Sequence, residues 1–352
     1  MKSKIITQDV TDIISALGND IKKLEGKTLL ISGGAGFLGG YVLAVIDELN
    51  NKMLKEKCRV ISVDNFLTGK SQRIAKLELD KRYFTFIKAD ISKPLTIRKK
   101  VDYILHAAGI ASPRYYREYP LETIDVTING TRHLLEFAKK QKVKSFLFFS
   151  SSEIYGDPDE KHVPTPEDYK GNVSCTGPRS CYDESKRLGE TLCMVYFDKF
   201  KVPVKTVRPF NVYGPGIHKD DYRVIPSFVY NSINGETLHV YEKGEQTRSY
   251  CYIADAIVYI LKVLLSTKNG EAYNIGNDSD EVSVNQLAKK VNKLFKNTLK
   301  IKRIKYPSSY PHDEPKRRCP DITKVKNLFG YSPQYNLEAG LQRTIDWVRE
   351  GN

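Results

Sequence analysis

Two residues four positions apart could carry out acid–base chemistry on an alcohol. On a helix, Tyr182 and Lys186 would share one face, and the lysine charge would lower the phenol's pKa from about 10 towards neutrality. In a chain this rich in tyrosine and lysine, chance alone supplies roughly two such pairs, so the context has to decide. That context is the stretch Ser150–Glu153, which stands where a buried parallel strand is predicted to end. Ligands bind at the carboxyl ends of such strands, so a hydroxyl there, close to a tyrosine–lysine helix, indicates a catalytic site.

A glycine-rich run between a predicted apolar strand and helix could hold a dinucleotide. The run, residues 33–39, reads GGAGFLG and fits the spacing GxxGxxG. Gly33 would form the tight turn, Gly36 would let the backbone approach a diphosphate, and Gly39 would let helix and strand pack closely. The helix N-terminus would then offer free N–H groups to the phosphates. With Tyr182 and Lys186 downstream, this run predicts hydride transfer with a nicotinamide cofactor.

Two aspartates at the ends of later strands refine the cofactor prediction. Asp64 ends the strand that follows the glycine-rich run, where a carboxylate can accept hydrogen bonds from the adenosine ribose hydroxyls. The same carboxylate would repel a 2′-phosphate, which favours NAD over NADP. Asp90, after the next strand, could reach the adenine or instead cap a following helix.

The elements that must position these residues alternate between strand and helix. Predicted strands cover 28–32, 59–63, 83–88, 101–106, 145–150 and 202–208, and predicted helices include 37–49, 123–140 and 181–200. This alternation predicts an α/β fold in which a doubly wound parallel sheet binds NAD, a Rossmann fold. Beyond residue 211 the alternation breaks down, which indicates a smaller C-terminal α+β region for the substrate.

The chain therefore divides into three predicted parts. Residues 1–26 form an N-terminal extension with an amphipathic helix over 8–25. Residues 27–212 form the NAD-binding domain, which regains 249–275, and 213–352 are mainly the substrate-binding region.

Composition excludes several classes of protein. The chain has 352 residues, a formal net charge of +14 and 40% hydrophobic residues, enough for a core and inconsistent with wholesale disorder. Its longest nearly apolar stretch, 256–265, is far shorter than the ~20 residues of a membrane span. The first residues lack the apolar region of a secretory signal, and six cysteines without metal-ligand spacing favour reduced thiols in the cytoplasm and no bound metal. The basic stretch 296–305 lacks interleaved aromatics, which disfavours nucleic acid as the anionic partner.

From residue 27 onward the chain resembles the extended short-chain dehydrogenase/reductase superfamily. Within it, the chain most resembles the UDP-glucuronate decarboxylases, also called UDP-xylose synthases. The stretch GPRSCYDESKR at 177–187 is the most specific mark of this resemblance. The others are DNFLTGK at 64–70, SSEIYGDP at 151–158, QTR at 246–248, and the more widely shared PDI at 320–322 and GYSP at 330–333.

The resemblance implies an NAD-dependent decarboxylation of UDP-glucuronate through a 4-keto sugar, with the hydride returned to C4. Tyr182 would be the base, Lys186 would hold the nicotinamide ribose, Ser151 or Ser152 would bind the C4 oxygen, and Glu153 would act at C5. The implied substrate contacts are Asn211, Arg223, Arg248 and Arg318. The implied cofactor contacts are Gly33, Gly36, Phe37, Leu38, Gly39, Asp64, Asn65, Gly69, Lys70, Asp90, Ala107, Ala108 and Lys186. The helices near 123–140 and 181–200 would pair in a homodimer, and the product would serve polysaccharide biosynthesis.

Three positions depart from the decarboxylase pattern and leave alternatives open. Thr127 stands where the family usually has Asn, and an asparagine is found at Asn129 instead; Gly216 and Tyr222 replace a usual Arg and Gly. The enzymatic alternatives are a nucleotide-sugar 4,6-dehydratase, which would expel water, and a C4 epimerase. A non-catalytic NAD-binding sensor on the same fold is an alternative of a different class.

Overall fold

A seven-stranded sheet forms the centre of the computed structural model, which describes residues 3–69, 77–218, 221, 223–306 and 314–351. All its neighbouring strands are parallel, in the order β11-β6-β5-β4-β1-β2-β3. The strands are β1 (Thr28–Ser32), β2 (Arg59–Asp64), β3 (Phe84–Lys88), β4 (Tyr103–His106), β5 (Ser145–Phe149), β6 (Val204–Pro209) and β11 (Glu271–Ile275). The predicted doubly wound Rossmann fold is therefore confirmed.

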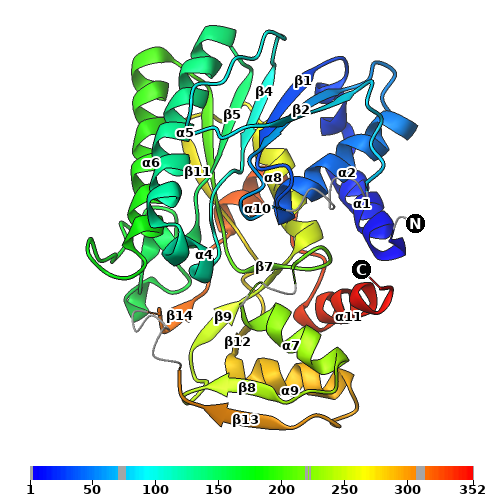
Figure 1. Cartoon of the computed structure of the whole chain (residues 1–352), viewed down its shortest axis with the longest axis vertical. Helices are drawn as coiled ribbons and strands as arrows, with labels where there is room; N and C mark the ends of the chain where they lie inside the picture. The colour runs from blue at the N-terminus through cyan, green and yellow to red at the C-terminus, as the bar shows by residue number, and fades with distance from the viewer. Residues whose placement is uncertain (1–2, 70–76, 219–220, 222, 307–313, 352) are drawn as a thin grey trace.

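Helices cover both faces of this sheet, and its central strands are therefore buried on both sides (Figure 1). Successive residues of β1 point to opposite faces: Leu29 and Ile31 pack in one hydrophobic core and Leu30 in the other. The first core includes residues of α1 (Lys4–Leu17), α2 (Phe37–Lys52) and α8 (Ile253–Leu265). The second includes residues of α5 (Pro120–Gln141) and α6 (Ser180–Phe200), which lie side by side. Both faces of β1, β4 and β5 are buried along the whole strand, which is typical of a parallel sheet covered by helices.

The N-terminal extension differs from the single helix that its periodicity predicts. α1 ends at Leu17, and a 3-10 helix, η1 (Gly18–Leu24), follows it. Gly18 breaks the helix because its φ of 55° and ψ of −130° lie outside the helical region. The apolar side chains are nevertheless buried, and α1 packs against α8, α2 and α11 (Leu337–Arg349).

The C-terminal half builds a layer of short elements below the carboxyl edge of the sheet in Figure 1. Short sheets pair β7 (Val212–Tyr213) with β10 (Cys251–Tyr252), β8 (Leu238–Tyr241) with β13 (Ile301–Ile304), and β9 (Thr247–Ser249) with both β12 (Glu281–Ser283) and β14 (Arg317–Arg318). The helices of this part are α7 (Val224–Ile233), α9 (Val284–Leu294), α10 (Thr323–Phe329) and α11. α8 and β11 interrupt this region and return to the central sheet, whereas the division into domains at residue 212 stays a prediction.

Three further short helices belong to the connections around the carboxyl edge. They are α4 (Pro113–Glu118), η2 (Ser152–Tyr155) and η3 (Glu160–His162). No helix among the described residues is long and apolar enough to cross a bilayer. The same residues contain no group of three or more His, Cys, Asp or Glu side chains placed to hold a metal ion.

Candidate active site

The glycine-rich turn joins β1 to α2 at the carboxyl edge of the sheet. Gly33 has a φ of 82°, and a Cβ there would lie 2.7 Å from the backbone nitrogen of Ala108, so only glycine fits. A Cβ on Gly39 would lie 2.3 Å from the carbonyl oxygen of Gly33, so only glycine allows the close approach of helix and strand that the motif predicts. Gly36 caps α2 without a side-chain hydrogen bond. The turn therefore brings bare backbone to a helix N-terminus, the arrangement that suits a diphosphate.

Asp64 lies beside this turn, at the end of β2. Its Oδ2 accepts a hydrogen bond from the backbone nitrogen of Ala35 at 2.9 Å, and its Oδ1 accepts one from that of Phe66 at 2.8 Å. These two bonds fix the carboxylate at the rim of the turn. A carboxylate in this position can accept hydrogen bonds from ribose hydroxyls.

The other predicted cofactor residues have mixed surroundings. Gly69 lies against the turn, since its Cβ would lie 3.0 Å from that of Ala35. The Asn65 side chain accepts a hydrogen bond from the backbone of Leu67, and Lys70 lies outside the described residues. Asp90 accepts a hydrogen bond from the backbone nitrogen of Ser92 at 2.9 Å within a turn. No helix begins there among the described residues 91–112, so the helix-capping alternative for Asp90 is wrong.

Tyr182 lies buried at the start of α6, within hydrogen-bonding contact of Ser151 at the end of β5. Its ring stacks on that of Tyr116 from α4, with centroids 5.2 Å apart and planes 13° apart. Burial raises the pKa of Tyr182 above its ordinary value, while the hydrogen bond with Ser151 and the charge of Arg223 lower it. Deprotonation of this phenol therefore depends on donors and cations around it, and the predicted effect of Lys186 on it stays a prediction.

Lys186 lies one helical turn further along α6. Its Nζ donates a hydrogen bond to the carbonyl oxygen of Phe149 at 2.7 Å and lies 5.7 Å from the centre of the Tyr182 ring. Burial lowers the pKa of Lys186 to about 8. A Cβ on Gly109 would lie 3.2 Å from Nζ, so the backbone after β4 passes directly over the ammonium group.

A buried histidine supports that backbone from below. His106 at the end of β4 contacts the Ser32 hydroxyl through Nδ1 at 2.7 Å and Thr131 Oγ1 through Nε2 at 3.0 Å. Since Thr131 donates its own proton to the carbonyl oxygen of Thr127, its oxygen must accept from the ring, which places a proton on Nε2. Burial and the charge of Lys186 keep the ring neutral, because they lower the pKa of His106 to about 3. Ala107 and Ala108 follow this fixed residue directly, and the backbone nitrogen of Ala107 donates to the Ser32 carbonyl at 3.0 Å.

Glu153 lies between two buried guanidinium groups. Arg318 from β14 donates from Nη1 to Oε1 at 2.5 Å and from Nη2 to Oε2 at 2.8 Å. Arg179, which precedes α6, donates from Nη2 to Oε2 of the same carboxylate. Burial would raise the pKa of Glu153, but the two arginines outweigh it and hold the pKa below its ordinary value. Glu153 is therefore ionised at neutral pH.

The other residues predicted to bind the substrate differ in their burial and in their hydrogen-bond partners. Arg248 on β9 is 6% exposed and donates to Glu314 Oε1 at 2.9 Å. The side chain of Arg223, before α7, is 41% exposed and pairs with Asp221, with Nε 2.8 Å from Oδ1. The charges of Arg223 and Glu153 affect each other, so the two lie in one electrostatic neighbourhood. Asn211, after β6, donates to the carbonyl oxygen of Ser249 at 2.8 Å and so joins the sheet edge to β9.

Two of the three departures from the decarboxylase pattern can be placed. Thr127 is buried on α5 below Thr131. Gly216 has a φ of 88° and faces Phe37, since its Cβ would lie 3.7 Å from that ring. The arginine that the decarboxylases usually have here is thus replaced by glycine at the rim of the glycine-rich turn. Tyr222 lies outside the described residues.

Several residues of this site were not predicted from the sequence. Arg179 belongs to the motif at 177–187, but its role follows only from the contact with Glu153. No motif or residue spacing singled out Tyr116 or His106, since their partners come from distant parts of the chain. Ser152 is buried beside Ser151, and the roles of all the predicted residues stay predictions.

Comparisons with known proteins agree with this geometry. Residues 29–276 match the NAD dependent epimerase/dehydratase family. The chain is 39% identical to UDP-glucuronic acid decarboxylase 5 of Arabidopsis thaliana, with 89% of this chain and 86% of that protein covered. It is 37% identical to UDP-glucuronic acid decarboxylase 1 of Xenopus tropicalis, with 94% of this chain and 74% of that protein covered.

Solved structures with the same fold bind nucleotide sugars. UDP-glucose 4-epimerase of Thermotoga maritima, solved with UDP-glucose, has a TM-score of 0.80 and 26% identity, with 92% of this chain and 99% of that chain covered. UDP-glucuronic acid 4-epimerase of Bacillus cereus, solved with UDP-glucuronic acid and NAD, has a TM-score of 0.75 and 29% identity, with 92% of this chain and all (100%) of that chain covered. The resemblance to extended short-chain dehydrogenases is confirmed, and the chain belongs to the NAD-dependent epimerase/dehydratase family.

Proposed function

We propose that this protein is an NAD-dependent lyase that decarboxylates UDP-glucuronate to UDP-xylose. The relatives named UDP-glucuronic acid decarboxylase are 36–39% identical over most of the chain. The observation that carries the proposal is the ionised Glu153, held by Arg179 and Arg318 in the neighbourhood of Tyr182. Guanidinium groups in this neighbourhood can bind the carboxylate of a sugar acid.

The residues at the glycine-rich turn fit NAD. Gly33 and Gly39 leave no room for a Cβ, Gly36 leaves the first turn of α2 without a side-chain cap, and Asp64 lies at the rim. The backbone of the turn would hold the diphosphate, Asp64 the adenosine ribose, and Lys186 the nicotinamide ribose. When bound, NAD accepts the hydride from C4 of the sugar and later returns it.

Tyr182 and Ser151 handle the proton at the C4 oxygen. Tyr182 Oη takes the proton of the C4 hydroxyl while C4 is oxidised, and the hydrogen bond from Ser151 stabilises the phenolate form. The ammonium group of Lys186 adds a positive charge on the same face of α6. The buried surroundings exclude water from this transfer, since Tyr182 is only 5% exposed.

Oxidation at C4 makes the sugar a β-keto acid, which can lose carbon dioxide. The C5–C6 bond breaks, and its electron pair moves into the C4 carbonyl, where donors such as Tyr182 and Ser151 stabilise the oxyanion by a few kcal/mol each. C5 then takes up a proton from solvent, delivered through a water molecule, so the overall reaction consumes one proton and releases carbon dioxide. Glu153 is ionised and has no proton of its own to give, so its role is to orient that water.

The basic character of the chain fits an anionic nucleotide sugar. Arg223, Arg248 and Arg318 are proposed to bind its diphosphate and carboxylate, with Asn211 shaping the pocket. A formal net charge of +14 attracts such a substrate from solution. Nucleic acid is not proposed as a partner.

A homodimer through α5 and α6 is part of the proposal. These two helices lie together on the outer side of the sheet (Figure 1). Leu121 on α5 is 70% exposed, and Leu188 and Val195 on α6 are 48% and 46% exposed. Leu188 and Val195 are seven residues apart and so lie on one face of α6. Exposed apolar side chains of this kind favour pairing with a second copy. A cytoplasmic location and a place in polysaccharide biosynthesis remain predictions.

The proposal is tested by mass spectrometry of the nucleotide sugar after incubation with NAD. Parallel samples contain UDP-glucuronate, UDP-glucose, dTDP-glucose or GDP-mannose. Loss of carbon dioxide from UDP-glucuronate without accumulation of NADH is the expected result. Loss of water from a neutral sugar would identify a 4,6-dehydratase, and a product of unchanged mass but altered retention would identify an epimerase. Binding of NAD with no turnover of any sugar would favour the non-catalytic sensor.

A further inference from the structure

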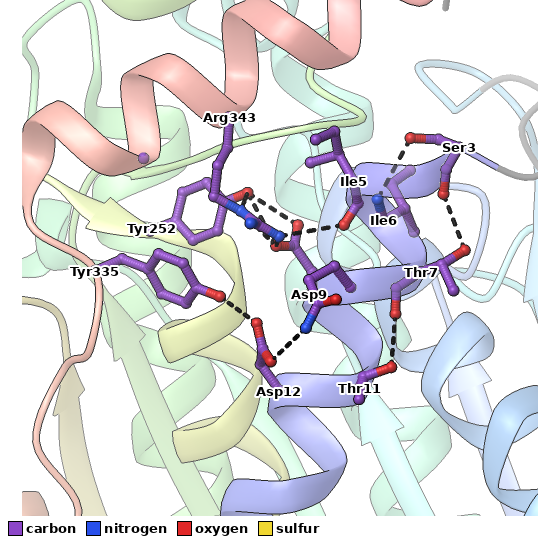
Figure 2. Close-up of polar contacts among 12 residues, drawn as sticks. Ser3, Ile5, Ile6, Thr7, Asp9, Thr11, Asp12, Tyr252, Tyr335 and Arg343 are labelled. Atoms are coloured by element: carbon purple, nitrogen blue, oxygen red, sulfur yellow. Dashed lines mark hydrogen bonds and ion pairs between the residues drawn. The ribbon is translucent and has the colours of Figure 1, made fainter.

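The N-terminal helix α1 carries a buried carboxylate that the proposed reaction does not use. Asp9 is fully buried, and its Oδ2 accepts hydrogen bonds from Tyr41 Oη and Tyr252 Oη, both at 2.9 Å. Arg343 from α11 donates to its Oδ1 from Nε at 3.0 Å and from Nη2 at 2.5 Å. Figure 2 shows Arg343 and Tyr252 both directed at Asp9. One side chain of α1 thus joins α2, β10 and α11.

A second contact of α1 reaches only the C-terminal side. Tyr335, in the segment before α11, donates from Oη to Asp12 Oδ2 (Figure 2). Its ring lies against that of Tyr252, with centroids 4.6 Å apart. This contact attaches α1 to the C-terminal segment and not to α2. Both acidic residues precede residue 29, where the match to the family begins.

The contact with Tyr41 leads to the glycine-rich turn. The Tyr41 ring packs edge-on against that of Phe37, the first residue of α2, with centroids 6.3 Å apart. A Cβ on Gly216 would lie 3.8 Å from the Tyr41 ring, so the ring also supports the segment that borders the turn. The hydrogen bond from Oη to Asp9 fixes the ring at its far end. Movement of Tyr41 would therefore disturb Phe37 and Gly216 together.

We infer that Asp9 is a positioning residue for the cofactor site, acting through Tyr41 on the first turn of α2. The inference rests on the proposed NAD-binding function. Asp9 acts on the turn through the Tyr41 ring, which packs against Phe37. Through Asp9, the N-terminal extension thereby helps to fix the position of the N–H groups that would bind the diphosphate.

The test compares two variants that each lose one tyrosine–aspartate hydrogen bond to α1. Tyr41→Phe removes the bond to Asp9 and keeps the ring, whereas Tyr335→Phe removes the bond to Asp12 on the side away from α2. Calorimetric titration of the full chain with NAD, without sugar, gives the dissociation constant. We expect Tyr41→Phe to bind NAD about fivefold more weakly, in the range by which residues acting through packed neighbours alter binding. Tyr335→Phe should bind NAD as the wild type does.

Turnover and a double variant separate positioning from general loss of structure. For Tyr41→Phe, the KM for NAD should rise about fivefold while kcat at saturating NAD changes less than twofold. Asp9→Asn combined with Tyr41→Phe should weaken NAD binding no further than the stronger single variant, because both act on the same bond. Equal NAD affinity in Tyr41→Phe and Tyr335→Phe would overturn the inference. Failure of the wild type to bind NAD would instead refute the proposed function.

Discussion

Replacing Arg179 by glutamine removes one of the two cations that hold Glu153. The side chains of Arg179 and Glu153 are only 8% and 17% exposed, so solvent screens the pair little. Breaking a buried ion pair outright costs about 3–5 kcal/mol, but Arg318 remains on the carboxylate in this variant. The expected loss is therefore that of one charge-assisted hydrogen bond and of the longer pair with Asp183, 3.7 Å away, together about 1.5–3 kcal/mol in the free energy of unfolding.

The pH dependence of this loss follows from the lowered pKa of Glu153. Ionised Glu153 stabilises the folded state above its ordinary pKa of 4.5, and the contribution is lost as the pH falls through the lower pKa of the folded state. The difference between wild type and Arg179→Gln should therefore be full at neutral pH. It should shrink only in acid, where Glu153 becomes protonated in both proteins.

Urea denaturation across a series of buffers measures this difference. Arg82→Gln is the matched control, because Arg82 also pairs with a carboxylate, Asp80, at 2.6 Å, but its side chain is 79% exposed. The control should leave the unfolding free energy unchanged, since exposed pairs contribute little. If Arg179→Gln were as stable as Arg82→Gln at neutral pH, the reasoning about the buried arginine pair would be refuted.

Four further predictions concern catalysis, the cofactor, titration and assembly. Tyr182→Phe should lower turnover by roughly a hundred- to ten-thousandfold, while calorimetry shows unchanged NAD binding; retained turnover would exclude Tyr182 as the base. Gly33→Ala should abolish NAD binding in the same titration, because its Cβ would lie 2.7 Å from the nitrogen of Ala108; wild-type affinity would contradict this turn geometry. The wild type should gain about 3 kcal/mol in unfolding free energy relative to Lys186→Met between pH 8 and pH 10.5, as measured by urea denaturation. The reason is that folded wild type loses the Lys186 proton near pH 8, whereas the unfolded chain keeps it until near pH 10.5. A constant difference between the two proteins would contradict the buried ammonium group. Val195→Glu should convert a dimer to a monomer in sedimentation analysis, since it would place a charge on the apolar face of α6; an unchanged mass would place the interface elsewhere.

The central sheet could be predicted because its strands signal themselves locally. Six of its seven strands were predicted from short runs of strand-forming residues, and β1 was predicted to the residue, at Thr28–Ser32, whereas β11 (Glu271–Ile275) was not among the predicted strands. The glycine-rich turn was equally accessible, since Gly33 and Gly39 are required by backbone approach and not by a distant side chain. Amphipathic periodicity was less reliable at the N-terminus. The apolar spacing continues through Gly18, where the backbone leaves the helical conformation.

Contacts between distant side chains could not be predicted in the same way. Asp9 pairs with Arg343, which is 334 positions away in the sequence, and Glu153 pairs with Arg318, which is 165 positions away. An aspartate on a predicted amphipathic helix is ordinarily assigned to the solvated face, yet Asp9 is fully buried. Its buried partners come from α2, β10 and α11, which only the folded chain brings together. The same limit applies to Arg179, whose residue type alone fits a surface position as well as a catalytic one.

The arginine pair on Glu153 has a further consequence for the proposed reaction. A sugar acid brings a second carboxylate towards a site that already contains an ionised one, and two such charges about 4 Å apart repel by about 4 kcal/mol near a protein surface. Arg179 and Arg318 balance the charge of Glu153 and that of Asp183, whose Oδ2 lies 3.7 Å from Arg179 Nε, so the substrate carboxylate meets a group that is neutral overall and not anionic. The same pair keeps Glu153 unprotonated, so that after carbon dioxide leaves, the proton at C5 has to come from water and the carboxylate can only orient it.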